Sequence, residues 1–264
     1  MKRQIHISGI NMFFRCGEQF RRRYIEGEKI PPGISLIIGI ATDESVTANL
    51  ANVIQHEEFL PIEAVRDFAR DSVENQFNAD EVMLDEDERK EGKKKIKGRA
   101  IDSAVNLSVL HYKEAAPAIK PVAVQKQWVI EADGFPFDIA GTMDVQEKDF
   151  SIRDTKTSSK TPPKSVADTS DQLTMYALAS WVIDKQMPPK VVLDYLIDLK
   201  NRKYKSFESV RTKKDFEYML NRIEVFAEAL EKEIFLPANS DNWICNPRWC
   251  GYALSCKYYR RRLS

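Results

Sequence analysis

The stretch GTMDVQEKDFSIRDTKTSSK, residues 141–160, largely decides the fold and the function predicted for this chain. Two runs rich in β-forming residues flank a polar segment, which predicts an antiparallel pair of strands with a turn at about residues 146–149. Because side chains alternate along a strand, Asp154 and Lys156 should project from one face, with Cα atoms about 6–7 Å apart. Asp144 ends the first strand, so the hairpin should bring its carboxylate beside that of Asp154.

Two carboxylates and an ammonium at one end of a sheet predict a site for phosphodiester hydrolysis. Carboxylates bind hard divalent cations such as Mg²⁺, which prefer oxygen ligands. Such a cation lowers the pKa of a bound water and neutralises charge that develops on a phosphate. Lys156 would orient that water or stabilise the pentavalent phosphorus.

The acid-x-Lys spacing alone is weak support, because residues 88–90, 91–93 and 198–200 contain similar acid-x-base triplets. Only Asp154 also has an aspartate near a turn upstream and a polar helix downstream. That helix, predicted over residues 164–185, carries Gln172 and Tyr176 four residues apart, on one face. Taken alone, these two residues fit an ordinary amphipathic helix better than a functional element.

The rest of the sequence predicts an α/β domain with helices packed on a mixed sheet. The other expected helices cover residues 8–24, with Ser8 as the cap, then 35–55, 61–77 and 212–233. Residues 80–99 turn from acidic to basic and are expected to form a solvated helix face or arch, with a strip that tracks DNA as the alternative; a helical pattern resumes to about 116. Three acid–base pairs in this stretch have the four-residue spacing that is favourable on a helix: Asp85/Arg89, Glu86/Lys90 and Glu91/Lys95. The expected strands cover residues 121–133, 135–145, 150–156, 191–199 and 204–210, with a tight turn at Asp133–Gly134. We expect one integrated domain with a helical region at 1–120, a core at 121–236 and a cysteine-rich tail at 237–264.

Several motifs together resemble the RecB-like branch of the PD-(D/E)xK nucleases. They are SGINMFFRCGEQFRRRYIEG at 8–27, SLIIGIATDESV at 35–46, GTMDV at 141–145, DTKTS at 154–158, QLTMY at 172–176 and the cysteine-rich tail. That branch includes CRISPR-associated RecB-like exonucleases, AddB-type helicase–nuclease subunits and many phage recombination exonucleases. The resemblance covers nearly the whole chain and implies a restriction-endonuclease-like core.

The resemblance also implies roles for individual residues. Asp144 and Asp154 would be metal ligands, the backbone carbonyl of Thr155 would supply another, and Lys156 would be the catalytic lysine. Gln172 and Tyr176 match the family's Q-x-x-x-Y element, which positions the active site and the DNA backbone. The implied metal is Mg²⁺ or Mn²⁺.

One position departs from the family pattern. Many members carry a histidine ligand four residues after the glycine of the second helix, and counting from Gly39 places Asp43 there. An aspartate is a competent ligand for a hard cation, so Asp43 is a candidate metal ligand with an altered metal preference. The alternative is a surface residue beside Glu44.

Four cysteines form the second candidate site. Cys16 lies near the N-terminus, and Cys245, Cys250 and Cys256 cluster near the C-terminus. Clustering of this kind favours metal binding over disulfides in a cytosolic protein, and four thiolates suit a 4Fe-4S cluster or a structural zinc. The spacing leaves both open, along with unpaired structural cysteines. The resemblance to iron–sulfur members of the family implies the cluster, which would tie the first helix to the tail.

Charge and hydropathy set the remaining expectations. The chain has 264 residues with 40 Lys+Arg and 40 Asp+Glu, so its overall field does not indicate a polyanionic partner. Basic residues and an interleaved tyrosine near the two ends nevertheless predict a rim for DNA ends or single strands, formed by Arg21, Arg22, Arg23, Tyr258 and Arg260. A solvated terminus is the alternative for the last two. No apolar stretch approaches the ~20 residues of a membrane span, and no signal core is visible, so we expect a cytoplasmic protein.

Together these observations predict a metal-dependent DNA exonuclease that acts in recombination, repair, or phage or CRISPR DNA processing. The alternatives are a DNA-binding or assembly module with a weak or inactive site, and an endonuclease on the same fold. The sequence contains no phosphate-binding loop, so ATP-driven motion is not expected.

Overall fold

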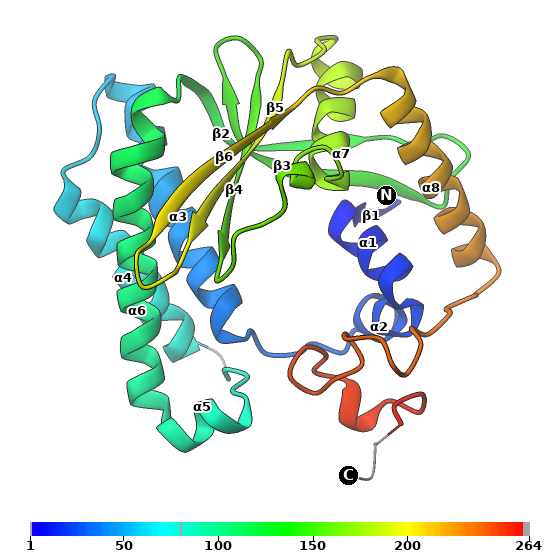
Figure 1. The fold of residues 1–264 in the computed structure, drawn as a ribbon. Helices are drawn as coiled ribbons and strands as arrows, with labels where there is room; N and C mark the ends of the chain where they lie inside the picture. The colour runs from blue at the N-terminus through cyan, green and yellow to red at the C-terminus, as the bar shows by residue number, and fades with distance from the viewer. Residues whose placement is uncertain (1, 80, 261–264) are drawn as a thin grey trace.

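A computed structural model describes residues 2–79 and 81–260, and its centre is a mixed sheet of six strands. The strand order is β1-β3-β4-β5-β6, and β2 pairs with β3 outside this path. The strands are β1 (Arg3–His6), β2 (Pro121–Ile130), β3 (Phe137–Glu147), β4 (Ile152–Ser158), β5 (Val191–Ile197) and β6 (Lys203–Ser209). The predicted α/β fold with a mixed sheet flanked by helices is confirmed (Figure 1).

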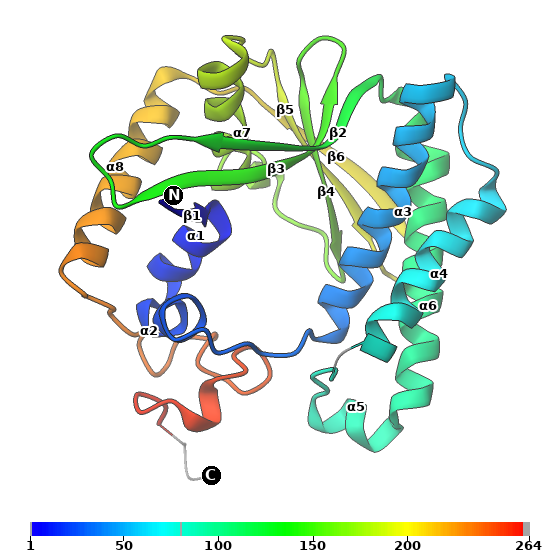
Figure 2. The same ribbon diagram turned by 180° about the vertical axis from the view of Figure 1, so that it is seen from behind.

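Two groups of helices lie at either side of the sheet (Figures 1 and 2). One group contains α3 (Ile34–His56), α4 (Ile62–Ala79), α5 (Glu86–Glu91) and α6 (Lys93–Leu110). The other contains α1 (Ile7–Arg15), α2 (Gly17–Phe20), α7 (Asp171–Ala179) and α8 (Lys213–Glu231). Short helical turns complete the chain: η1 (Arg21–Ile25), η2 (His111–Ala115), η3 (Ala116–Ala118), η4 (Lys164–Val166), η5 (Ser180–Asp184) and η6 (Ala253–Ser255). No helix in the described ranges is long and apolar enough to cross a membrane.

The long strand β3 organises the sheet because it has neighbours along both edges. It pairs with β2 from Glu147 to Ile139, and on its other edge it pairs in parallel with β1 up to Ala140. On that same edge it pairs with β4 only at Val145 and Gln146. The stretch between these two partners, which includes Asp144, is therefore where the sheet opens.

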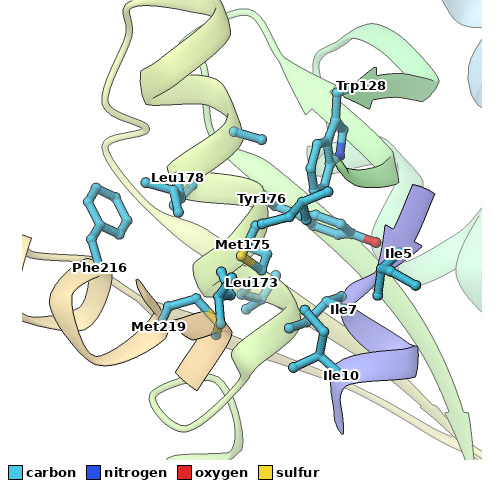
Figure 3. Close-up of a cluster of buried hydrophobic side chains, with 14 of the residues drawn as sticks. Ile5, Ile7, Ile10, Trp128, Leu173, Met175, Tyr176, Leu178, Phe216 and Met219 are labelled. Carbon is cyan, nitrogen blue, oxygen red and sulfur yellow. The ribbon is translucent and has the colours of Figure 1, made fainter. Parts of the chain in front are cut away.

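The main hydrophobic core lies between this sheet and the α1–α7–α8 group (Figure 3). The apolar face of α7 supplies Leu173 and Met175, which are fully buried, and α8 supplies Met219. The ring of Trp128 from β2 meets that of Tyr176 edge-on, with 6.4 Å between centroids. Burial of such side chains, each worth about 1.5–3 kcal/mol, fixes α7 against the sheet.

The helix predicted over residues 8–24 is interrupted in the structure. Cys16 is extended, with φ −163°, and separates α1 from α2. The cause lies far along the chain: Gly17 N–H donates to Leu236 O at 2.7 Å, and the tail backbone lies so close that a Cβ on Gly17 would collide with it. The prediction of Ser8 as the cap is also wrong, since α1 already begins at Ile7.

The charged stretch is divided between two helices, α5 and α6. Gly92, with φ +89°, separates α5 from α6. Asp85 does not pair with Arg89 as expected; instead it caps α5 by accepting from Glu88 N–H at 2.9 Å. Of the three predicted pairs, Glu91–Lys95 forms, at 3.5 Å.

Two other boundaries differ from expectation. The helix predicted over residues 164–185 begins only at Asp171, because Ser170 caps it by accepting from Leu173 N–H at 3.2 Å. Strand β1 is an addition to the expected strands. It has only four residues, too few to show a clear alternation of polar and apolar side chains.

We expect Gly141→Ala to destabilise the fold, because a Cβ at this position would lie 2.7 Å from Cε2 of Trp128. Overpacking of this kind costs about 1–3 kcal/mol. Urea unfolding should show the loss. The matched control is Gly98→Ala in α6, where nothing lies within 4 Å of the added Cβ, and this change should stabilise by about 0.5–1 kcal/mol. Equal stabilities for the two variants would contradict the packing of Trp128 on Gly141.

Candidate active site

Asp144 and Asp154 lie where β3 and β4 separate. The last paired residues of the two strands are Val145 and Arg153, so one further step of the same register places Asp144 opposite Asp154. The ladder ends before this step, and the backbone N–H of Thr155 donates instead to Asp144 Oδ2, at 3.1 Å. The expected neighbourhood of the two carboxylates is thus observed, at the opening of the sheet.

Lys156 and Asp154 project from the same face of β4, as the alternation of a strand requires. Lys156 Nζ lies 2.7 Å from Asp154 Oδ2, and the Asp154 side chain is completely buried. Neither oxygen of this carboxylate accepts a hydrogen bond of good geometry within the described chain. A buried carboxylate without hydrogen bonds is costly unless a cation compensates it, and here the ammonium provides part of that compensation.

Asp43 on α3 faces the same cluster from the helical side. Its Oδ2 accepts a hydrogen bond from Gln125 Nε2 at 3.1 Å, and its charge acts on that of Asp144. One turn before it, Gly39 permits a close approach of α3 to β4, since an added Cβ would lie 3.4 Å from Thr157 Oγ1. The structure therefore places Asp43 beside the predicted ligands.

Gln172 and Tyr176 close the site from α7. Gln172 Nε2 donates to the Tyr176 hydroxyl at 2.5 Å. Burial, and then the charges of Asp154 and Asp144, raise the pKa of Tyr176. The phenol is therefore neutral and close enough to the carboxylates to feel their charge.

Protonation of the cluster reflects three carboxylates held together away from water. Burial, then the charges of Asp154 and Asp43, raise the pKa of Asp144 to about 8. Burial and the charge of Asp154 raise the pKa of Asp43 to about 6. Burial lowers the pKa of Lys156, but the charges of Asp154 and Asp144 outweigh this effect, so its pKa is raised. The cluster carries more potential negative charge than Lys156 neutralises.

The donor set suits a divalent cation such as Mg²⁺ or Mn²⁺. It offers carboxylate oxygens from Asp43, Asp144 and Asp154, and the two oxygens of Asp154 lack hydrogen bonds. Hard cations prefer such ligands. As the side chains stand, however, no three His, Cys, Asp or Glu residues in the described part of the chain converge closely enough to hold a metal ion. Lys156 occupies the position next to Asp154, so small rotations of the carboxylates would have to accompany binding.

A pocket that Lys156 helps to line lies next to the cluster. Its lining combines α1, the start of α7 and β5, and includes Asn11, Ser170, Gln172 and Tyr195. Arg211 supports this wall from behind: its guanidinium donates to the carbonyl of Ala167 at 2.6 Å and to Thr174 Oγ1 at 2.8 Å. The loop before α7 is thereby fixed relative to the site.

The four cysteines line one common pocket, to which Cys16 comes from the break between α1 and α2. Burial and the neighbouring thiols raise the pKa of Cys245, and burial raises the pKa of Cys250. The segments are close: Ala238 N–H donates to Cys16 Sγ at 3.4 Å. Within residues 2–79 and 81–260 the thiols do not converge to metal-binding distances, and the geometry does not establish an iron–sulfur cluster.

Of the residues predicted to form the DNA-binding rim, two arginines are engaged in ion pairs within the chain and the others are exposed. Arg21 is paired with Glu18 at 2.8 Å, and Arg22 with Glu28 at 2.6 Å. The Arg22 guanidinium also lies 4.7 Å from the ring centroid of Tyr252, so this region meets the tail. The other predicted contacts are exposed: Arg23, Tyr258 and Arg260.

Sequence reasoning missed two features that surround the site. Gln125 on β2 bonds to Asp43, and Arg153, on the opposite face of β4, forms ion pairs with Glu147 at 2.7 Å and Asp194 at 2.9 Å. No local pattern marks Gln125. The alternation that places Asp154 in the site also places Arg153 behind it, which could have predicted a buried arginine.

Comparison with known proteins agrees with this geometry. A family model of the PD-(D/E)XK nuclease superfamily matches residues 7–257, and the chain belongs to that superfamily. A crystal structure named "Putative exonuclease", from Eubacterium rectale, has a similar fold, with TM-score 0.60, 12% identity, and coverage of 99% of this chain and 91% of that one. A structure named SSO0001 covers 97% of this chain and 96% of its own, at 12% identity and TM-score 0.37. No curated protein matches.

Without a divalent cation, the free energy of unfolding should fall as the pH rises from about 4 to about 8. In the folded state the pKa values of Asp144 and Asp43 are raised to about 8 and about 6, so folding favours the protonated carboxyls. The stability that this preference contributes is complete below the pKa that these carboxyls have in the unfolded chain, and it is lost as the pH rises through their pKa values in the folded state. Asp144→Asn should therefore stabilise the metal-free protein at pH 8, by about 2 kcal/mol. Thermal melts in EDTA at pH 5.5 and pH 8 provide the measurement.

The control for this prediction is Asp198→Asn, since Asp198 is half-buried in an ion pair with Arg202 at 2.9 Å. This change should leave the pH dependence intact. A wild-type protein that is as stable at pH 8 as at pH 5.5 in EDTA would contradict the raised pKa values of Asp144 and Asp43.

Proposed function

We propose that this protein is a metal-dependent DNA exonuclease. The observation that carries the proposal is the meeting of three carboxylates from α3, β3 and β4 with the ammonium of Lys156 where the sheet opens. Membership of the nuclease superfamily supports hydrolysis of a phosphodiester. Exonuclease rather than endonuclease action is supported by the motif resemblance and by the exonuclease name of the Eubacterium rectale protein with a similar fold.

In this proposal, separate residues bind the metal, stabilise the developing charge and orient the substrate. Asp144, Asp154, the Thr155 carbonyl and Asp43 would hold a divalent cation, which supplies an acidified water and neutralises charge on the phosphate when bound. Lys156, which pairs with Asp154 in this structure, would donate to the oxygen that becomes negative in the transition state. The neutral hydroxyl of Tyr176, fixed by Gln172, would orient Lys156 and the DNA backbone.

The approach of DNA would follow the pocket beside Lys156. The pocket walls offer polar side chains, Asn11 and Ser170, and the ring of Tyr195. Side chains of this kind bind sugar–phosphate and stack on unpaired bases. Arg23, Tyr258 and Arg260 would extend the contact beyond the pocket. Arg21 and Arg22 contribute less charge, because their glutamate partners neutralise them.

We expect Lys156→Ala to reduce cleavage of linear DNA at least about 100-fold with Mg²⁺ present, because it removes a donor to the developing charge. Circular dichroism should show that the variant is folded. The matched control is Lys200→Ala, which changes the lysine of another acid-x-Lys triplet just after β5 and should leave the rate unchanged. Full activity of Lys156→Ala would contradict the proposed role.

The form of the substrate separates the alternatives. An exonuclease should degrade linear DNA and leave a closed circle of the same sequence intact. Cleavage of the circle would indicate an endonuclease on this fold, and binding of DNA without cleavage at any Mg²⁺ or Mn²⁺ concentration would indicate an inactive binding module.

We further propose that Cys16, Cys245, Cys250 and Cys256 together hold a metal cofactor, a 4Fe-4S cluster in the first instance and zinc as the alternative. Their shared pocket and the hydrogen bond to Cys16 Sγ support the proposal, since hydrogen bonds to the sulfurs are one of the ways in which a protein tunes such a cluster. The cofactor would stabilise the junction between the α1–α2 break and the tail. It takes no part in hydrolysis.

Protein purified without oxygen should absorb broadly in the visible range if the cluster is present, and Cys250→Ser should lose this band. We also expect a lower Tm for this variant, because metal binding couples to folding. A serine control within the tail, Ala238→Ser, keeps all four thiols and should keep the band. A colourless wild-type protein that contains one equivalent of zinc would support the alternative occupant, and a metal-free one would exclude both.

A further inference from the structure

Gln125 is the residue of the site that neither the motifs nor the family match singles out. It lies in the middle of β2, between Val124 and Lys126, which pair with Val145 and Met143 of β3. The same register puts Gln125 opposite Asp144. Across three neighbouring strands, Gln125, Asp144 and Asp154 therefore stand in one row.

The backbone of Gln125 is unusual for a strand. Its φ is +48°, in the left-handed region, while its neighbours in β2 continue the ladder. A residue other than glycine in this region costs about 1–3 kcal/mol, so it persists only where the surroundings hold it. The pairing of β2 with β3 does not account for this strained conformation, which lies next to the carboxylate cluster.

The side chain of Gln125 links β2 to α3 through two hydrogen bonds. Its Nε2 donates to Asp43 Oδ2 at 3.1 Å and lies 3.2 Å from Thr47 Oγ1. Asp43 and Thr47 are one helical turn apart on α3, so a single amide links this face of the helix to β2. Asp43 has no other hydrogen bond from a side chain in the described chain, and Gln125 is thus the group that fixes its carboxylate.

From these contacts we infer that Gln125 is a positioning residue that orients Asp43 toward the metal site. The inference rests on the proposed function, since it assigns Asp43 to the cation. With one oxygen held by the amide, the other would remain available to the cation. An aspartate reaches less far than a histidine ring, and the amide would compensate by restricting Asp43 to the orientation in which it can reach the cation.

The test is the affinity for Mg²⁺ alone, measured by isothermal titration without DNA. Gln125→Met keeps the length of the side chain but cannot donate, and we expect it to weaken Mg²⁺ binding about 10-fold. Gln127→Met, an exposed position on the same strand, should bind like the wild type. Gln125→Gly removes the side chain at a position where the positive φ favours glycine. This variant should bind Mg²⁺ more weakly without a lower Tm, whereas a merely structural role of Gln125 would predict a lower Tm.

A double-mutant cycle shows whether Gln125 acts through Asp43. Added to Asp43→Asn, the Gln125→Met change should alter Mg²⁺ affinity by less than about 2-fold, because its target carboxylate is already gone. Full additivity, or unchanged affinity in both Gln125 variants while the wild type binds Mg²⁺, would overturn the inference and leave the proposed function standing. A wild-type chain that binds no divalent cation would overturn both.

Discussion

Mutual repulsion among Asp43, Asp144 and Asp154 is the constraint on which the rest of the site depends. Asp154 is completely buried and Asp43 and Asp144 are half-buried beside it, and Lys156 is the ammonium that faces them. Burial raises the pKa values of Asp144 and Asp43, and the repulsion raises them further, since each deprotonation adds charge to a region that water reaches poorly. An arrangement of this kind lowers stability in the absence of a cation, so the surrounding structure must hold it in place.

The surrounding structure does so from three directions. Behind β4, Arg153 pairs with the buried Glu147 and Asp194, which ties β3 and β5 to β4 next to the point where β3 departs. Removing either partner of such a pair leaves an uncompensated buried charge, so the arrangement is rigid even if its net contribution is small. From the second side Gly39 lets α3 approach closely, and from the third Arg211 fixes the segment that leads into α7.

The parts of the fold that the sequence could predict are those set by neighbouring residues. Alternation along residues 141–160 is sufficient to place Asp154 and Lys156 on one face and Asp144 beside them, because hairpin pairing is local. The break at Cys16 cannot be predicted in this way, since its cause is a contact with Leu236, near the opposite end of the chain. Asp85 fits a pairing and a capping role equally well, and no pattern in β2 marks the positive φ of Gln125.

Contacts that do not involve cysteine already hold the tail against the first helices. The Tyr252 hydroxyl donates to Glu28 O at 2.6 Å, and Gly251 lies so close to Ile30 that a Cβ would overlap that side chain. Arg248 reaches further, to Asp85 at the start of α5, at 3.7 Å. Because the pairing of the two ends is distributed over such contacts, a cofactor at the four thiols would reinforce a junction that side-chain packing has already formed. The four cysteines line one pocket at this junction.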